Sequence, residues 1–186
     1  MFELLTILAP KRNFRIFKDD SRFERVCCKP WEYVDRLSQY KQVMTPDVSC
    51  YIDMPLEEQW HNTFLNRIIG KYWQTRGLIV IPTISWSDKQ SYSFAFTGIE
   101  IGCIVAVSTI GTHEYYDMFM DGFIEMCNQI NPEAVVCYCP PYQEMYHYSK
   151  VVYVEYEGRL ARFNAKHRPN PNQLTLFDID YKKEVG

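Results

Sequence analysis

Two aspartates stand just after predicted strands, where carboxylates can act as acids or bases. Asp47 follows the apolar run that begins at Val43, and Asp88 follows the run that ends at Ile81. Paired carboxylates divide the acid and base roles when their surroundings give them different pKa values. We therefore expect Asp47 to act as general base or nucleophile, with Asp88 as its partner.

Cationic, aromatic and hydroxyl side chains are predicted at the same edge of the sheet. We expect Arg67 to contact an anion and Trp86 to stack on a sugar or a nucleobase. Ser108 and Thr109 follow the next apolar run and complete the predicted substrate-binding set. The alternative is structural: both aspartates would cap turns, and Trp86 would fill a gap in the core.

Motifs for metals, dinucleotides and serine hydrolases are missing from the sequence. The cysteines of Cys27–Cys28 and Cys137–Cys139 lack the two-residue gap usual in zinc knuckles. The glycines of Gly98–Gly102 lack the continuation of a phosphate-binding loop, and no Gly-x-Ser-x-Gly elbow occurs. We predict no metal site. The cofactor, the substrate and whether the protein is an enzyme stay open.

The bulk composition is that of a cytoplasmic globular protein. The chain has 186 residues, of which 47% are hydrophobic and 23% are charged, so it can bury a core without disulfides. Its net charge of -3 argues against coating nucleic acid through bulk charge. Seven cysteines, an odd number, argue against a disulfide framework. The apolar run near the N-terminus is too short to cross a membrane, so we expect no membrane partner.

Apolar runs alternate with helical patterns along most of the chain, which predicts an α/β fold. The two main predicted helices run from Asp53 to Arg76 and from Thr112 to Ile130. Such alternation builds right-handed strand–helix–strand units. We predict a mainly parallel or mixed sheet with flanking helices, either an open sheet or a reduced, distorted barrel. The predicted strands are 43–49, 78–81, 103–107, 134–137 and 151–156, with a short or edge strand at 91–96.

The first main helix has clear ends and an apolar face. Glu57 and Glu58 lie in its first turn, where the helix dipole favours negative charge, and Gly77 is suited to a left-handed cap. The first 42 residues have the weakest pattern, with a helix predicted over 31–41 and a short strand over 13–18. The apolar face of the main helix, expected to contact the core, comprises Leu56, Trp60, Phe64, Ile68 and Tyr72.

A composition change divides the chain into a single α/β domain, residues 1–158, and an extended tail, residues 159–186. The stretch His167–Asn172 is polar and interrupted by prolines, as in extended linkers. The next five residues, Gln173–Phe177, resemble the peptide by which bacterial polymerases, mismatch-repair proteins and many phage proteins bind the sliding clamp. Gln173, Leu174, Leu176 and Phe177 match that motif, and Thr175 stands where Ser or Asp is commoner. The alternative is a last strand that packs on the domain.

The globular part resembles the family known as domain of unknown function 4417, over residues 43–156 and the region 14–37. The resemblance implies a phage, prophage or plasmid setting, largely in Firmicutes, and no established activity. Cys139–Pro141 departs from the glycine-containing ending of the family pattern. The segments that carry the resemblance are Thr45–Ser49, Asp53–Pro55, Asn66–Arg67, Ile81–Trp86, Phe94–Ile99 and Val105–Thr109.

Three functional hypotheses follow. The first is a phage or mobile-element protein of bacterial DNA metabolism, recruited to the sliding clamp by its tail and acting on or binding nucleic acid. The second is a non-catalytic anti-defence inhibitor, similar in role to an anti-CRISPR protein, that binds a host protein or nucleic-acid complex. In the third, the clamp-binding peptide is itself the activity and competes with host polymerases.

Overall fold

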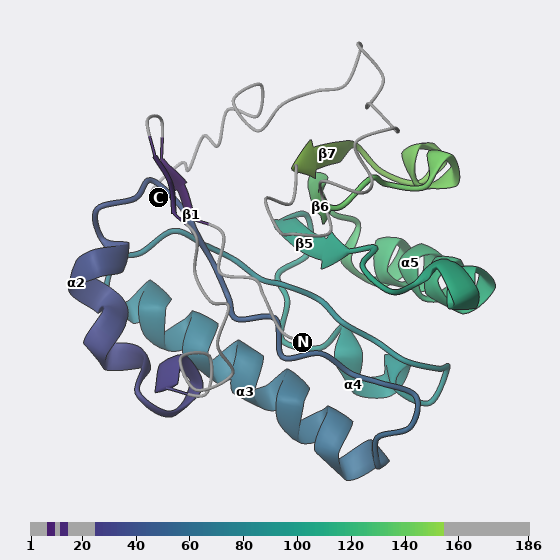
Figure 1. The fold of residues 1–186 in the computed structure, drawn as a ribbon, viewed down its shortest axis with the longest axis horizontal. Coiled ribbons are helices and arrows are strands. Elements are labelled where there is room, and N and C mark those ends of the chain that lie inside the picture. The colour runs from purple at the N-terminus through teal and green to yellow at the C-terminus, as the bar shows by residue number, and fades with distance from the viewer. Residues whose placement is uncertain (1–6, 10–11, 15–24, 155–186) are drawn as a thin grey trace.

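Five parallel strands lie side by side in the order in which they occur along the chain. The computed structural model describes residues 7–9, 12–14 and 25–154. A bridge between Thr83 and Ala106 joins a two-stranded sheet to a three-stranded one. The described residues form no closed barrel, so the predicted α/β class with an open parallel sheet is confirmed. The strands are β3 (Val43–Met44), β4 (Val80–Ile81), β5 (Ile104–Ser108), β6 (Ala134–Tyr138) and β7 (Val151–Val154). Figure 1 shows the last three of them, β5, β6 and β7, as neighbouring arrows.

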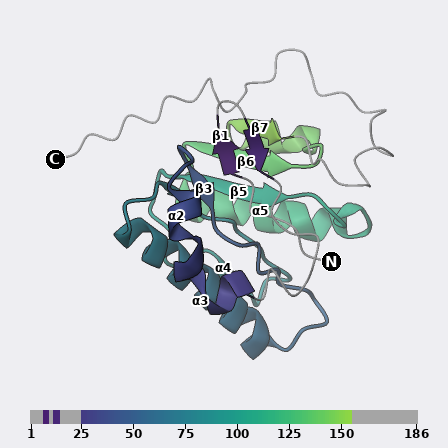
Figure 2. The same cartoon turned by 60° about the vertical axis from the view of Figure 1, so that its left-hand side comes forward.

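Two long helices connect these strands, as predicted. Helix α3 begins after Pro55 and is followed by Gly77, whose φ of +82° is left-handed. Helix α5 ends at Asn131, which is also left-handed. A separate antiparallel pair, β1 (Ile7–Ala9) and β2 (Arg12–Phe14), lies against β3 (Figure 2). The helices are η1 (Pro30–Tyr33), α2 (Val34–Leu37), α3 (Leu56–Thr75), α4 (Tyr92–Ala95), η2 (His113–Tyr115), α5 (Tyr116–Ile130) and η3 (Gln143–His147).

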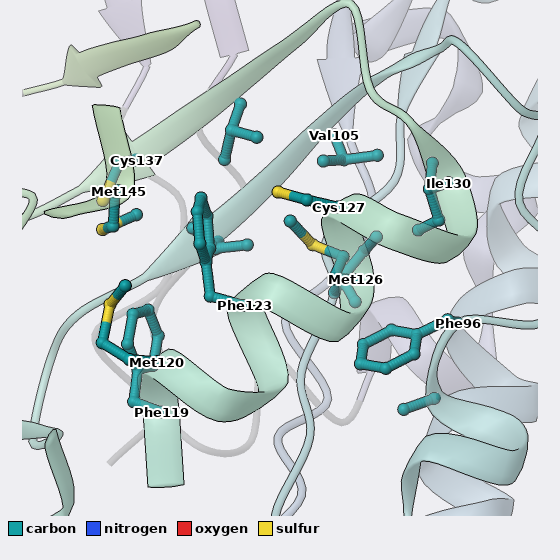
Figure 3. Close-up of a cluster of buried hydrophobic side chains, with 14 of the residues drawn as sticks. Phe96, Val105, Phe119, Met120, Phe123, Met126, Cys127, Ile130, Cys137 and Met145 are labelled. Carbon is teal, nitrogen blue, oxygen red and sulfur yellow. The ribbon is translucent and has the colours of Figure 1, made fainter. Parts of the chain in front are cut away.

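Both long helices cover the same face of the sheet. Phe123 of α5 packs in a cluster with Val105 and Cys137 of the strands (Figure 3), and Trp73 of α3 packs with Val43. Strand residues alternate between faces, and right-handed crossovers between strands in chain order place all helices on one side. The opposite face is a second buried apolar cluster of Met44, Ile81, Ile104, Ala106, Ala134, Val136, Tyr138 and Val152.

The prediction that the apolar face of α3 is buried against the core is wrong. Trp60 and Phe64 are 52% and 48% exposed, and Leu56 and Ile68 are exposed as well. The N-terminal half of α3 lies above the carboxyl ends of β3 and β4, where polar groups meet, and only its C-terminal half contacts apolar strand residues. The buried side of α3 consists of Gln59, Thr63, Asn66, Ile69, Gly70 and Trp73.

Several predicted boundaries also change. The predicted short strand 91–96 is instead the site of helix α4, in which Ala95 N donates to Ser91 O. The prediction was wrong because a short alternating run does not distinguish a strand from a helix. β3 stops at Met44, since Pro46 has no N–H to donate to a ladder. The helix predicted over 31–41 is the pair η1 and α2, which ends at Leu37.

Some predictions fall on residues that the structure leaves undescribed. These are residues 15–18 of the predicted early strand and the whole tail from 159, including Gln173–Phe177. Within the described ranges, no helix combines the length and the apolar character needed to cross a membrane.

Candidate functional site

A small polar hollow lies beyond the carboxyl ends of β3 and β4, where parallel sheets commonly bind ligands. It leaves about 10 Å³ for the centre of a water molecule, which is the room that one water requires. A whole sugar or nucleobase does not fit in this space. The residues that line it are Asp47, Val48, Thr63, Asn66, Arg67, Thr83 and Ser85.

A buried hydrogen-bond network forms the base of the hollow and joins β3, α3 and β4. The hydroxyls of Thr45 and Thr83 lie 2.8 Å apart, and Asn66 Nδ2 donates to Thr83 Oγ1 at 2.9 Å. Asn66 Nδ2 also donates to Pro46 O at 2.6 Å. A Cβ on Gly70 would lie 2.8 Å from Thr45 Cγ2, so glycine permits this close approach of α3. The network fixes the spacing between the helix and the strand ends.

Arg67 is a cation held by neutral groups alone. Its guanidinium donates to Asn66 Oδ1 at 2.6 Å and Thr83 O at 3.3 Å, and to the carbonyls of Ala95 at 2.7 Å and Thr97 at 3.1 Å. These bonds use four of its five N–H groups. No carboxylate pairs with it among the described residues. Because burial disfavours the charged form, the pKa of Arg67 falls to about 10.

Asp47 supplies the acidic group of the hollow. Part of the residue reaches solvent, but its carboxyl group is enclosed by protein atoms, and this burial raises its pKa to about 6. A hydrogen bond with the Ser49 side chain opposes the shift. Asp47 and Arg67 line the same hollow without forming an ion pair. The carboxyl group therefore titrates within reach of neutral pH, as an acid–base group requires.

Cys50 lies next to the hollow but lacks the character of a nucleophile. Its backbone N–H donates to Ser85 Oγ at 2.9 Å, and its thiol is directed at Gln59 O, 3.6 Å away. Burial raises the pKa of the Cys50 thiol, so the reactive thiolate is disfavoured. In the part of the chain that the structure describes, no three His, Cys, Asp or Glu residues gather as metal ligands.

Trp86 lies in the core beside α5, outside the lining of the hollow. Its ring is tilted against Phe119, with centroids 5.2 Å apart, and meets the edge of Phe96 at 5.9 Å. These contacts leave Trp86 half-buried as a packing residue. These contacts fit the packing alternative, and Trp86 does not line the hollow.

Asp88 also lies outside the hollow. Its carboxylate accepts a hydrogen bond from Gln90 N at 2.9 Å, and its carbonyl accepts one from Ser91 Oγ at 2.7 Å. This arrangement is an Asx turn that precedes α4. The structure does not bring Asp88 to Asp47, so the geometry offers one carboxyl group at the hollow instead of a pair.

Ser108 and Thr109 stabilise the neighbouring strand ends. Thr109 Oγ1 donates to Tyr138 O at 3.2 Å and Pro140 O at 3.1 Å, which ties the end of β5 to the end of β6. Ser108 Oγ accepts from Ile110 N at 3.2 Å. Neither residue lines the hollow. Of the predicted set, the hollow therefore brings together Asp47 and Arg67.

Helix α3 contributes two polar residues to the hollow beside the predicted Arg67. Thr63 and Asn66 line the hollow from the buried side of the helix, on which Gln59 also lies one turn earlier. The available signal was the spacing: these polar residues and Gly70 recur on one helical face. The apolar pattern of the helix predicts the opposite face as the buried one.

The chain belongs to the family described as "Domain of unknown function (DUF4417)", whose model matches residues 9–157. Its relatives include the "Gene 1 protein" of Mycobacterium phage L5, which is 34% identical over 125 residues, 66% of this chain and 55% of the relative. The "Gene 1 protein" of Mycobacterium phage D29 is 33% identical over 125 residues, 66% of this chain and 46% of the relative. The match thus covers about half the length of these curated relatives. No solved structure matches. The predicted family and its phage association are confirmed.

Proposed function

We propose that this phage-type protein acts in bacterial DNA metabolism and that its hollow receives a phosphate oxygen of a nucleic-acid substrate. The observation that carries the proposal is the position of Arg67, a half-buried cation whose guanidinium is bonded only to neutral groups and has no acidic partner among the described residues. A buried charge is costly unless an opposite charge accompanies it. An anionic oxygen at the hollow would supply that charge.

The size of the hollow decides which part of a substrate enters. Space for one water also fits one phosphate oxygen, whereas the sugar and base would remain outside. Arg67 has one N–H group left after its four internal bonds. Arg67 would therefore bind the phosphate through electrostatic attraction and a single hydrogen bond. It would not form the bidentate contact that arginine often makes to phosphate.

Asp47 is assigned the role of general base. With a pKa of about 6 it is mostly ionised near neutral pH, yet basic enough to accept a proton. A water or substrate hydroxyl at the hollow would give its proton to the Asp47 carboxylate. An anti-defence inhibitor, the second hypothesis, needs an exposed complementary surface and would tolerate loss of Asp47, whereas an enzyme would not.

The test is an NMR titration of the Asp47 carboxyl carbon with and without inorganic phosphate. We expect a pKa near 6 in the free protein and a higher value with phosphate, because a second negative charge nearby disfavours the carboxylate. Arg67→Gln should abolish the effect of phosphate. The matched variant Arg76→Gln, at the exposed C-cap of α3, should retain it. An Asp47 titration unchanged by phosphate would contradict the proposal.

The tail is proposed to bring the protein to its substrate. Gln173, Leu174, Leu176 and Phe177 match the clamp-binding motif, and an extended peptide on a linker can place such side chains in an apolar groove. Burying the Leu and Phe side chains contributes about 1.5–3 kcal/mol each before the cost of ordering the peptide. Recruitment to the clamp would raise the local concentration of DNA around the hollow.

A further inference from the structure

Helix α3 presents a continuous apolar stripe to solvent. Leu56, Trp60, Phe64 and Ile68 recur at every fourth position and are all exposed. The Trp60 and Phe64 rings stack with centroids 5.3 Å apart and planes 9° from parallel. A contiguous apolar patch of this kind marks an interaction surface.

Opposite charges stand at the two ends of this stripe. Glu57 lies about two helical turns before Phe64, and Lys71 lies about two turns after it, both on the exposed face. Neither residue makes an ion pair within the described part of the chain. The surface is therefore self-complementary: its acidic end fits the basic end of an identical surface turned around.

We propose that α3 packs against α3 of a second copy of this chain, antiparallel, about a twofold axis near Phe64. The twofold axis sets Glu57 of each copy opposite Lys71 of the other, so both ion pairs form at once. Trp60 and Phe64 then pack against the same residues of the partner copy. Antiparallel helices also place opposite ends of their dipoles together. This inference goes beyond the proposed function and does not depend on the hollow.

The size of the patch sets the expected strength of the dimer. A helix of 20 residues is about 30 Å long, and one face of it is smaller than the roughly 800 Å² per partner of standard interfaces. We therefore expect a reversible dimer with a micromolar dissociation constant. Surface ion pairs at its ends make the dimer weaker at high salt.

Sedimentation velocity of the full chain over a range of concentrations tests the dimer. We expect a shift from monomer to dimer with concentration, and a monomer throughout for Phe64→Glu. The matched control is Ile101→Glu, because Ile101 is 74% exposed and does not belong to α3, so its change should leave the dimer intact. Circular dichroism checks that each variant is folded. A wild-type monomer at all concentrations, or a dimer insensitive to Phe64→Glu, would overturn the proposal.

Charge reversal tests the antiparallel register. Lys71→Glu or Glu57→Lys alone sets like charges opposite each other twice, which should weaken the dimer about tenfold. The double variant restores opposite charges and should recover wild-type association. A double variant as weak as either single variant would exclude this arrangement of the two helices.

Discussion

The Asp47 carboxyl group has a raised pKa because it is buried, and its neighbours only partly offset this effect. Burial raises its pKa from 3.8 to about 6, and the Ser49 hydrogen bond opposes but does not cancel the effect. Arg67 lines the same hollow without pairing to it. A carboxylate kept enclosed in this way lowers stability at neutral pH. Such a cost is common at functional sites, where reactivity takes precedence over stability.

We predict that Asp47→Asn stabilises the protein at pH 7.5 while removing any activity that depends on the hollow. Because the pKa of Asp47 is higher in the folded state, protonation of Asp47 favours folding. The free energy of unfolding of the wild type therefore increases as the pH falls from above 6 towards 4. This contribution is lost again as the pH rises through 6. The gain for Asp47→Asn at pH 7.5 is about 2–3 kcal/mol at most.

Urea unfolding at pH 7.5 and pH 4.5 measures this difference. The variant should lack the rise in stability that the wild type gains on acidification. Asp53→Asn, at an exposed position outside the hollow, is the matched control and should change little. A variant less stable than the wild type at pH 7.5 would show that the Asp47 carboxylate is structural.

Sequence position predicted Asp47, and the family resemblance added Arg67, but their predicted companions lie elsewhere. The rule that ligands bind beyond parallel strands identifies an edge of the sheet. It does not say where each loop turns. After β4 the chain passes the hollow at Thr83 and Ser85 and then enters the core at Trp86. Burial of an individual side chain depends on such tertiary contacts, which no local pattern encodes.

At the scale of elements, α3 shows how periodicity can identify a helix and still give the wrong buried face. The bounds of α3 were predicted closely because Pro55 and Gly77 limit it chemically. The predicted orientation of α3 rests on the assumption that its apolar residues face the core. The polar network around Asn66 reverses that orientation. The exposed stripe would then find its apolar contacts in a second copy.

Helix α5 depends on a single glycine for its contact with Trp86. A Cβ on Gly122 would overlap Nε1 and Cδ1 of Trp86. We predict that Gly122→Ala lowers the free energy of unfolding by about 2 kcal/mol or more, despite the better helix propensity of alanine. Thermal unfolding measures this loss of stability, with Asn128→Ala, a change at an exposed position of the same helix, as the control. A stabilised Gly122→Ala variant would contradict the packing role of Trp86.

At the scale of the whole molecule, the order of strands was largely predictable. Three of the five predicted main strands, those at β5, β6 and β7, coincide with strands in the structure over most of their length, and β4 covers half of its predicted strand. Apolar runs between proline, glycine and polar residues have few alternatives. The short strand β3 and the helical nature of α4 were not predictable, since a few residues carry too little periodicity.

Calorimetry tests the proposed recruitment of this protein to the sliding clamp. The full chain would be titrated into a bacterial sliding clamp beside a variant in which Gln173, Leu176 and Phe177 are changed to Ala. We predict micromolar or tighter binding by the intact protein and its loss in the variant. Absence of binding by the intact protein would contradict the claim and leave the inhibitor hypothesis as the leading one.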